Sequence, residues 1–188
     1  ARIGDSRWVS MHWIARVDSG DEATDILNVT PMSQNDPRWR HHRLGTSSST
    51  IGQMGCLVTC AAMVVKYFGY DTDPGRLNQL LIQNGGYWQG NLFVWGAISK
   101  IWPLKIGEWV DCLKVPAPLN KLDDALARKE TVIVWVDFNP KTAIEEMHWV
   151  VIVGKRGIDD YWMIDSWDGK LLGFRERYAN PYRYIFRI

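Results

Sequence analysis

The sequence predicts an α+β fold in which helices come first along the chain and an antiparallel sheet follows. Between residues 56 and 126, apolar residues recur at the three- and four-residue intervals of helices packed on a core. From Thr131 onward, β-branched and aromatic residues form short runs separated by polar turns, as in strands. The 188 residues, 46% of them hydrophobic, are enough for one domain with a substantial core.

Composition excludes several classes of protein. The net charge is +1 and no run of Lys or Arg occurs, so no nucleic-acid partner is expected. The apolar runs are too short to cross a bilayer. Three cysteines cannot form a full disulfide framework. The sequence has no Cys-x-x-Cys or His-x3-His spacing of the kind that binds zinc. The adjacent His41 and His42 are expected in a solvated loop, and no metal or cofactor is expected.

The first 29 residues are predicted to be a linker or the tail of a preceding module, ahead of a domain over residues 30–188. Residues 7–14 alternate loosely like a strand, and residues 18–22 have the composition of a loop. The chain begins at Ala1 without an initiator Met or a signal peptide. We therefore expect a processed product or a piece of a larger multidomain chain.

The elements around and after the predicted start of the domain lead to a buried helix. Residues 27–30 are predicted to form a short strand, Asn35-Asp36-Pro37 a turn, and residues 46–50 a loop that runs into the helix. The helix starts at Cys56, after the two glycines Gly52 and Gly55. Its apolar face is formed by Leu57, Ala61, Val64, Val65 and Phe68. Gly69 is the expected left-handed residue that ends it.

Three further helices are predicted before the sheet. Asp73 and Pro74 are the N-cap and first residue of one that stops at Gly85-Gly86. The next is predicted from Asn91 to just before Pro103, and the last from an Asn120 cap through Leu126. Strands are predicted at residues 131–136, 148–154, 161–165 and 182–187, with a break at Asn139-Pro140, a loop at residues 155–160 and a hairpin turn at Asp168-Gly169.

Cys56 has two interpretations. At the first turn of a helix, unpaired N–H groups and the helix dipole favour an anion, so the position predicts a thiolate with a pKa below its ordinary range. The glycines before it would let a substrate backbone approach. The alternative is that Cys56 is a small buried hydrophobic residue, as most free cysteines are. Cys60, one turn further along the helix, is predicted to lie in the core.

His148 and Asp165 are polar residues at the ends of two predicted strands. If these strands form an antiparallel pair, the start of one lies beside the end of the other, and the two side chains meet at the same edge of the sheet. Asp165 can then fix the imidazole tautomer while the second ring nitrogen faces a nucleophile. Taken alone, His148 is explained equally well as a strand-end or core histidine, and Asp165 is explained better as a turn residue.

The combined pattern resembles a known family. The carrying motifs are Gln34-x-Asp36-Pro37-x-Trp39, Thr50-Ile-Gly-x-x-Gly-Cys56-x-x-Thr59-x-x-Ala62-Met63, His148-Trp-Val-Val-Ile-Val-Gly154 and Ile164-Asp165-Ser-Trp-Asp-Gly169. They are similar to the papain-like cysteine peptidases related to bacteriocin-leader-processing (double-glycine) peptidases, and most similar to a freestanding branch of bacterial and phage envelope proteins. The resemblance covers residues 30–188.

The resemblance implies a papain-like fold in which the Cys helix packs on the sheet. It also implies that Cys56 is the nucleophile, His148 the general base and acid, and Asp165 the orienting residue. A glutamine should complete the oxyanion hole with the Cys56 N–H. Thr50 occupies the position where leader-processing peptidases have that glutamine, so Gln34 is the first candidate and Gln53 the second.

The expected activity is hydrolysis of an amide bond through a thioester. Candidate substrates are glycine-rich peptides and the stem or cross-bridge peptides of peptidoglycan, which implies an extracellular or cell-envelope location. Gly55 beside the nucleophile, and the aromatic residues Trp39, Trp88 and Trp149, are compatible with binding either substrate. The alternatives are an inactive module of the same fold that binds peptide or cell wall, and a thiol-dependent acyltransferase.

Overall fold

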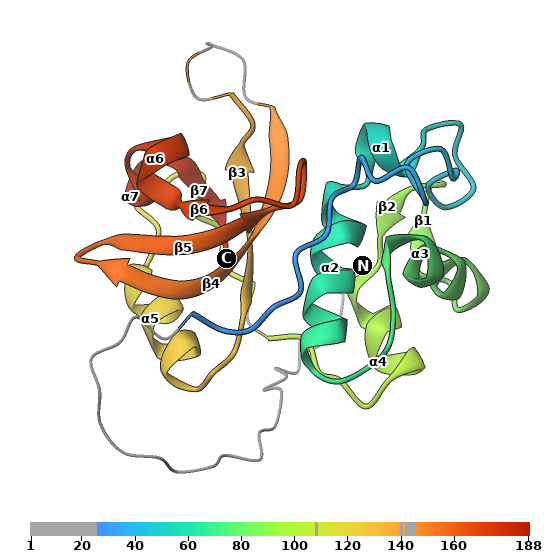
Figure 1. Cartoon of the computed structure of the whole chain (residues 1–188), viewed down its shortest axis with the longest axis horizontal. Coiled ribbons are helices and arrows are strands. Elements are labelled where there is room, and N and C mark those ends of the chain that lie inside the picture. The colour runs from blue at the N-terminus through green and yellow to red at the C-terminus, as the bar shows by residue number, and fades with distance from the viewer. Residues whose placement is uncertain (1–25, 108, 140, 142–145) are drawn as a thin grey trace.

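The computed structural model describes residues 26–107, 109–139, 141 and 146–188. Figure 1 shows two halves, with helices α1 to α4 in one and the main sheet with α5 to α7 in the other. The two predicted segments at residues 7–14 and 18–22 lie outside the described residues, as does Pro140. The predicted order of helices first and an antiparallel sheet afterwards is confirmed.

The first half is built around the helix that begins with Cys56. Its elements are α1 (Ile51–Met54), α2 (Cys56–Tyr67), α3 (Pro74–Gln83), the two-stranded ribbon β1 (Tyr87–Trp88) and β2 (Leu92–Phe93), the 3-10 turn η1 (Trp95–Ala97) and α4 (Ile98–Ile101). As predicted, Asp73 caps α3 by accepting the N–H of Arg76 at 2.9 Å. Gly69, after α2, is left-handed with a φ of 91°.

Several predicted boundaries are wrong for local reasons. The helix expected from Asn91 starts later, because Gln89 and Gly90 form a positive-φ turn that pairs β1 with β2. The expected loop before Cys56 contains α1, and residues 27–30 form no strand. The fourth helix, α5 (Leu119–Ala127), begins one residue before its expected cap at Asn120.

The second half is a five-stranded antiparallel sheet. Its strands are β3 (Val132–Asp137), β4 (Met147–Gly157), β5 (Asp160–Asp165), β6 (Leu171–Gly173) and β7 (Ile185–Arg187), in the order β6-β5-β4-β3-β7. Between β6 and β7 lie α6 (Phe174–Tyr178) and α7 (Pro181–Tyr184). The first half of the predicted last strand is therefore helical. Asn180 is the N-cap of α7, its side chain accepts the N–H of Tyr182, and Pro181 is the first helical residue.

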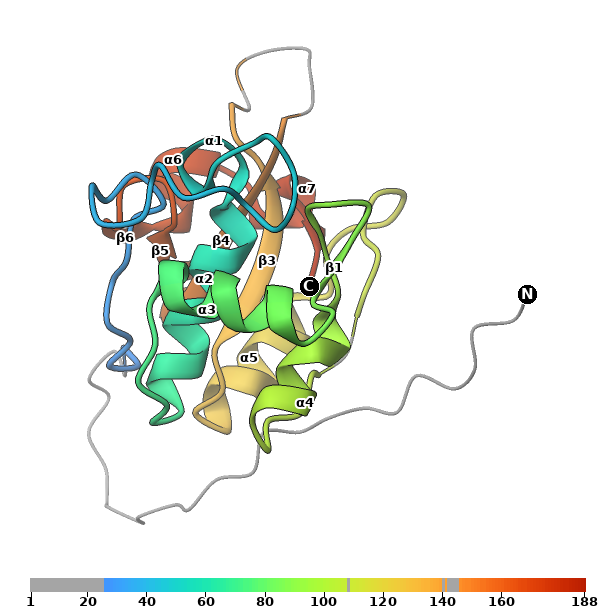
Figure 2. The same cartoon turned by 90° about the vertical axis from the view of Figure 1, so that its right-hand side faces the viewer.

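The sheet buries both faces. One face packs on α2, where Val58, Ala61 and neighbours meet Trp149, Val151 and Val153. The opposite face packs on α5 and α6 through Val150, Ile152, Tyr161, Leu122 and Phe174. Figure 2 shows α3 and α2 in front of β3 and β4. Two buried faces explain why β4 is an almost continuous apolar run.

Residues 26–29 pack with the domain, whereas the sequence predicts that they belong to the preceding segment. Leu27 and Val29 are buried in the α2 core, and the Leu27 N–H donates to the Val153 carbonyl at 2.7 Å. Within the described residues, no helix is long and apolar enough to span a membrane.

Candidate active site

Four segments distant in the sequence meet at one end of α2. The loop at residues 33–36 is tied to the end of β5 by the bond from the Gln34 N–H to the Ser166 carbonyl at 2.7 Å. The Ser166 hydroxyl and the Cys60 thiol both donate to the Trp149 carbonyl, at 2.7 and 3.2 Å. The Gln34 side chain donates to the Gly52 carbonyl at 2.9 Å. These bonds hold the start of α2 against β4 and β5.

His148 and Asp165 meet as the strand-edge argument predicts. Asp165 pairs with Val150 in the β4–β5 ladder, so His148 lies two residues away on the same face. The His148 Nε2 and Asp165 Oδ1 atoms are 2.8 Å apart, and both side chains are buried. A carboxylate at Nε2 favours the tautomer with the proton there, which leaves Nδ1 as the free base.

Asp165 is held by more than the histidine. Its Oδ1 also accepts the Trp167 N–H at 2.9 Å, and its Oδ2 lies 2.8 Å from Nη1 of Arg177 in α6. Burial acts to raise the pKa of Asp165, but the bond to His148, the charge of Arg177 and the Trp167 N–H outweigh burial and lower that pKa. Arg177 was not predicted, since an arginine in Phe-Arg-Glu-Arg-Tyr has no local signal of a contact this distant in sequence.

Cys56 is the first residue of α2 and is half-buried. Burial raises the pKa of its thiol from 9.0 to about 11. The backbone N–H groups of Trp149, Leu57 and Cys56 itself act against burial, in the direction expected of a helix N-terminus. The prediction of a lowered pKa is therefore wrong, because desolvation of the thiolate exceeds the stabilisation by these amides. The Trp149 amide adjoins His148 in the chain, so Cys56 lies beside the start of β4.

The two candidate glutamines differ in burial and in bonding. Gln34 is buried, and its Nε2 donates to Gly52 within the turn that precedes Cys56, while its Oε1 has no hydrogen-bond partner. Gln53 is exposed, and its Oε1 accepts the N–H of Thr50 in a capping box of α1. Gln34 therefore lies in the interior beside the Cys56 turn, whereas Gln53 serves the start of α1.

The family model described as the Peptidase_C39 like family matches residues 26–185. The chain belongs to this family. The predicted resemblance and the α+β, papain-like fold with the cysteine on an N-terminal helix are confirmed. Membership supports cysteine peptidase activity in general. No curated protein matches the chain.

In this member of the Peptidase_C39 like family, the glycines before Cys56 serve internal packing. A Cβ on Gly55 would lie 2.5 Å from the Ile51 carbonyl oxygen, and one on Gly52 would lie 2.9 Å from that of Arg40. Both positions need glycine because backbone passes against them. This packing gives a structural reason for Gly55, and its expected contact with substrate stays a prediction.

Trp39 and Trp149, expected at a substrate surface, are core residues. Both are buried, and the Trp39 indole N–H donates to the Ser33 carbonyl at 2.7 Å. Trp149 is packed among the rings of Trp95, Trp109 and Trp135. Neither offers a free ring face to a substrate. Of the three aromatic residues named from the sequence, Trp88 is exposed, at 63%.

Trp167 is an exposed aromatic residue at the site that the sequence did not single out. It directly follows Ser166, its backbone N–H contacts Asp165, and its side chain is 40% exposed. Its ring lies 5.1 Å from that of Phe138, which lies 5.1 Å from the His148 ring. A wall of two aromatic rings therefore extends from His148 to solvent.

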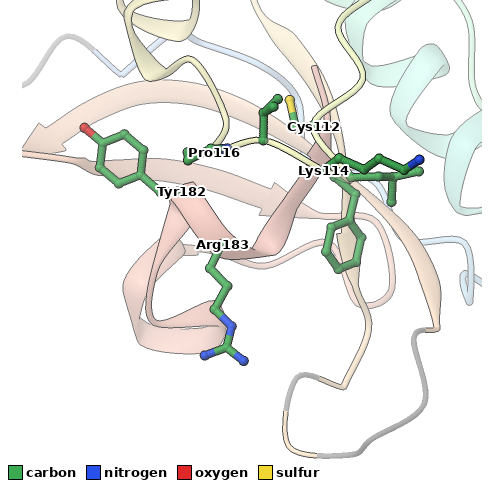
Figure 3. Close-up of a pocket in the computed structure, with 8 residues that line it drawn as sticks. Cys112, Lys114, Pro116, Tyr182 and Arg183 are labelled. Carbon is green, nitrogen blue, oxygen red and sulfur yellow. The ribbon is translucent and has the colours of Figure 1, made fainter.

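A separate cavity of about 350 Å³ lies between the segment at residues 112–116 and the α7–β7 segment, and Figure 3 shows the side chains that line it. Cys112, Lys114, Tyr182 and Arg183 are among its lining residues, and Cys56, His148 and Asp165 are not. No cluster of three or more His, Cys, Asp or Glu in the described part of the chain could hold a metal ion.

Proposed function

We propose that this protein is a cysteine peptidase that cleaves a peptide amide bond with Cys56 as nucleophile, His148 as general base and acid, and Asp165 as the residue that orients His148. The observation that carries the proposal is the buried 2.8 Å bond between His148 and Asp165, placed where the next backbone amide along β4 stabilises the Cys56 thiolate. A base oriented by a carboxylate beside a nucleophile is the arrangement that covalent amide hydrolysis requires.

The pKa of Cys56, about 11, decides how the first step runs. The thiol keeps its proton at neutral pH, so His148 Nδ1 takes that proton while Sγ attacks the substrate carbonyl carbon. The tetrahedral oxyanion collapses as His148 gives the proton to the leaving amine, and a thioester remains. His148 then takes a proton from water, whose oxygen attacks the thioester and releases the carboxylate product and the thiol.

The oxyanion is proposed to bind the Cys56 N–H and the Gln34 side chain. The first N–H groups of a helix have no intrahelical partner, so the Cys56 N–H suits this role. A primary amide nitrogen carries two hydrogens, and the bond from Gln34 Nε2 to the Gly52 carbonyl uses one of them. The second can serve the oxyanion. Gln53 is the weaker candidate because it is exposed and bonded to Thr50.

The proposed substrate is a peptide, with peptidoglycan stem or cross-bridge peptides as the favoured class and the cell envelope or exterior as the place of action. Trp167 and Phe138 support contact with an extended chain beside the catalytic histidine, in place of Trp39 and Trp149. Aromatic rings can stack on sugar rings or cover apolar side chains, which suits both components of cell-wall material.

The test measures the rate at which iodoacetamide alkylates Cys56, mapped by mass spectrometry from pH 5 to 10. Cys60 and Cys112 are buried, so selective labelling of Cys56 would follow from exposure alone and does not decide. The deciding result is whether the labelling rate of Cys56 depends on His148. We expect His148→Ala to slow labelling of Cys56 at pH 7 by at least about tenfold, while His41→Ala, at an exposed histidine, leaves the rate unchanged.

An unchanged rate in His148→Ala would remove the base from the proposal and leave a binding module as the better interpretation. With the base in place, incubation with peptidoglycan fragments and with glycine-rich peptides tests the substrate class. New termini would then be identified by mass. Transfer to an added amine in place of water would identify an acyltransferase.

A further inference from the structure

Arg177 is placed to act on the proposed triad from outside it. Its Nη1 is 2.8 Å from Oδ2 of Asp165, the oxygen that faces away from His148. The Arg177 side chain is 28% exposed, whereas that of Asp165 is fully buried. One carboxylate therefore bridges a histidine in β4 and an arginine in α6.

A fully buried carboxylate needs a countercharge to stay ionised. The titratable groups that face Asp165 come from three elements, namely His148 from β4, Cys56 and Cys60 from α2, and Arg177 and Tyr178 from α6. Among these groups, the guanidinium alone carries a permanent positive charge. Before His148 gains a proton, Arg177 therefore supplies the positive charge, beside the hydrogen bonds from His148 and the Trp167 N–H, that keeps Asp165 ionised.

Packing fixes the guanidinium in this position. It lies 5.3 Å from the centre of the Phe138 ring and 5.6 Å from that of Tyr178. Phe138 also contacts the His148 ring at 5.1 Å. The same aromatic side chain therefore supports the arginine and the histidine on the two sides of Asp165, which is the support that a precise catalytic geometry needs.

We propose that Arg177 is a positioning residue of the peptidase, which keeps Asp165 ionised and oriented and sets the pH at which His148 can act as a base. The inference rests on the proposed function. Arg177 does not touch the reacting atoms. Its positive charge, acting through Asp165, disfavours the binding of a proton from solvent to the His148–Asp165 pair. The pair therefore stays unprotonated, and free to take the proton of Cys56, down to a lower pH than it would without the arginine.

Removal of a nearby positive charge makes protonation of the pair more favourable, so the pair gives up its proton at a higher pH. Loss of the charge also makes the Cys56 thiolate less favourable. Both changes shift the profile of alkylation rate against pH in the same direction, towards alkaline pH.

The experiment measures iodoacetamide labelling of Cys56 between pH 5 and 10 in the full chain. We expect Arg177→Gln to shift the acidic limb upward by about 0.5 to 1 pH unit, which lowers the rate at a fixed pH on that limb by about 3- to 10-fold. Arg177→Lys retains the charge and should stay near the wild-type profile. Arg175→Gln is the matched control, because it removes one charge from the same helix, where Arg175 is exposed and donates to the Asp159 carbonyl.

A rate lowered by one factor at every pH, with Arg177→Lys equally affected, would show a merely structural role and overturn the inference. Arg177→Met is a second neutral variant. The inference requires the alkaline shift in every neutral variant, Arg177→Gln or Arg177→Met, whose circular dichroism spectrum matches that of the wild type. If neither neutral variant folds, an alkaline shift in Arg177→Lys would also overturn the inference. Failure of the proposed function has a different result, since labelling would then be insensitive to His148→Ala.

Discussion

The two sides of the proposed site are built to different degrees. On the sheet side, His148 and Asp165 share a short buried bond, and Arg177 supplies the countercharge. On the helix side, burial keeps the Cys56 thiol protonated, and the Gln34 amide is bonded to its own turn at Gly52. In the proposed mechanism the base is therefore already oriented in the free protein, and we expect the proposed nucleophile and oxyanion donors to become active as a carbonyl group enters.

The largest effect is expected at the nucleophile. Cys56→Ala should lower peptidase activity by roughly 10⁴- to 10⁶-fold, because the thioester cannot form. Cys60→Ala is the matched control, one helical turn away. It loses a buried thiol and its bond to the Trp149 carbonyl, so it should lower the melting temperature and retain most of the activity. Equal loss of kcat in both variants would contradict the assignment of Cys56.

The second comparison separates the two glutamines. Gln34→Ala should lower kcat by about 10²- to 10³-fold, as loss of one oxyanion donor does. Gln53→Ala should leave kcat within about threefold and lower the free energy of unfolding by about 0.5 to 1 kcal/mol, since it breaks the capping box of α1. The measurement is kcat for a cleaved peptide together with urea unfolding. The reverse order of the two kcat values would move the oxyanion donor to Gln53.

Local sequence patterns predicted the parts of the site that depend on local structure. The period of residues 57–68 and the β-branched runs placed Cys56 at a helix start and His148 and Asp165 at the ends of strands, and antiparallel pairing then brought the latter two together. Trp39 was misinterpreted because a sequence does not reveal whether an aromatic residue faces a neighbouring segment or solvent. In this structure, it is packed against its own chain.

The parts that local patterns could not predict depend on tertiary contacts. Arg177 contacts Asp165 because α6 packs on the face of the sheet opposite α2, and no spacing in the sequence indicates that contact. The pKa of Cys56 is the sum of two opposed effects. The helix N-terminus can be recognised in the sequence, but the burial that outweighs it arises only in the folded protein.

The smallest expected effect tests that balance through stability. Burial raises the pKa of the Cys56 thiol to about 11 from 9.0, so between these pH values the unfolded chain has lost a proton that the folded protein retains. The free energy of unfolding should therefore fall as pH rises through this range. Cys56→Ala lacks the thiol and should lose less stability, by about 1 to 2 kcal/mol, in urea unfolding at pH 8.5 and 10.5. A larger loss in the variant than in the wild type would instead mean that the folded protein favours the thiolate, and the helix side would then be as preorganised as the sheet side.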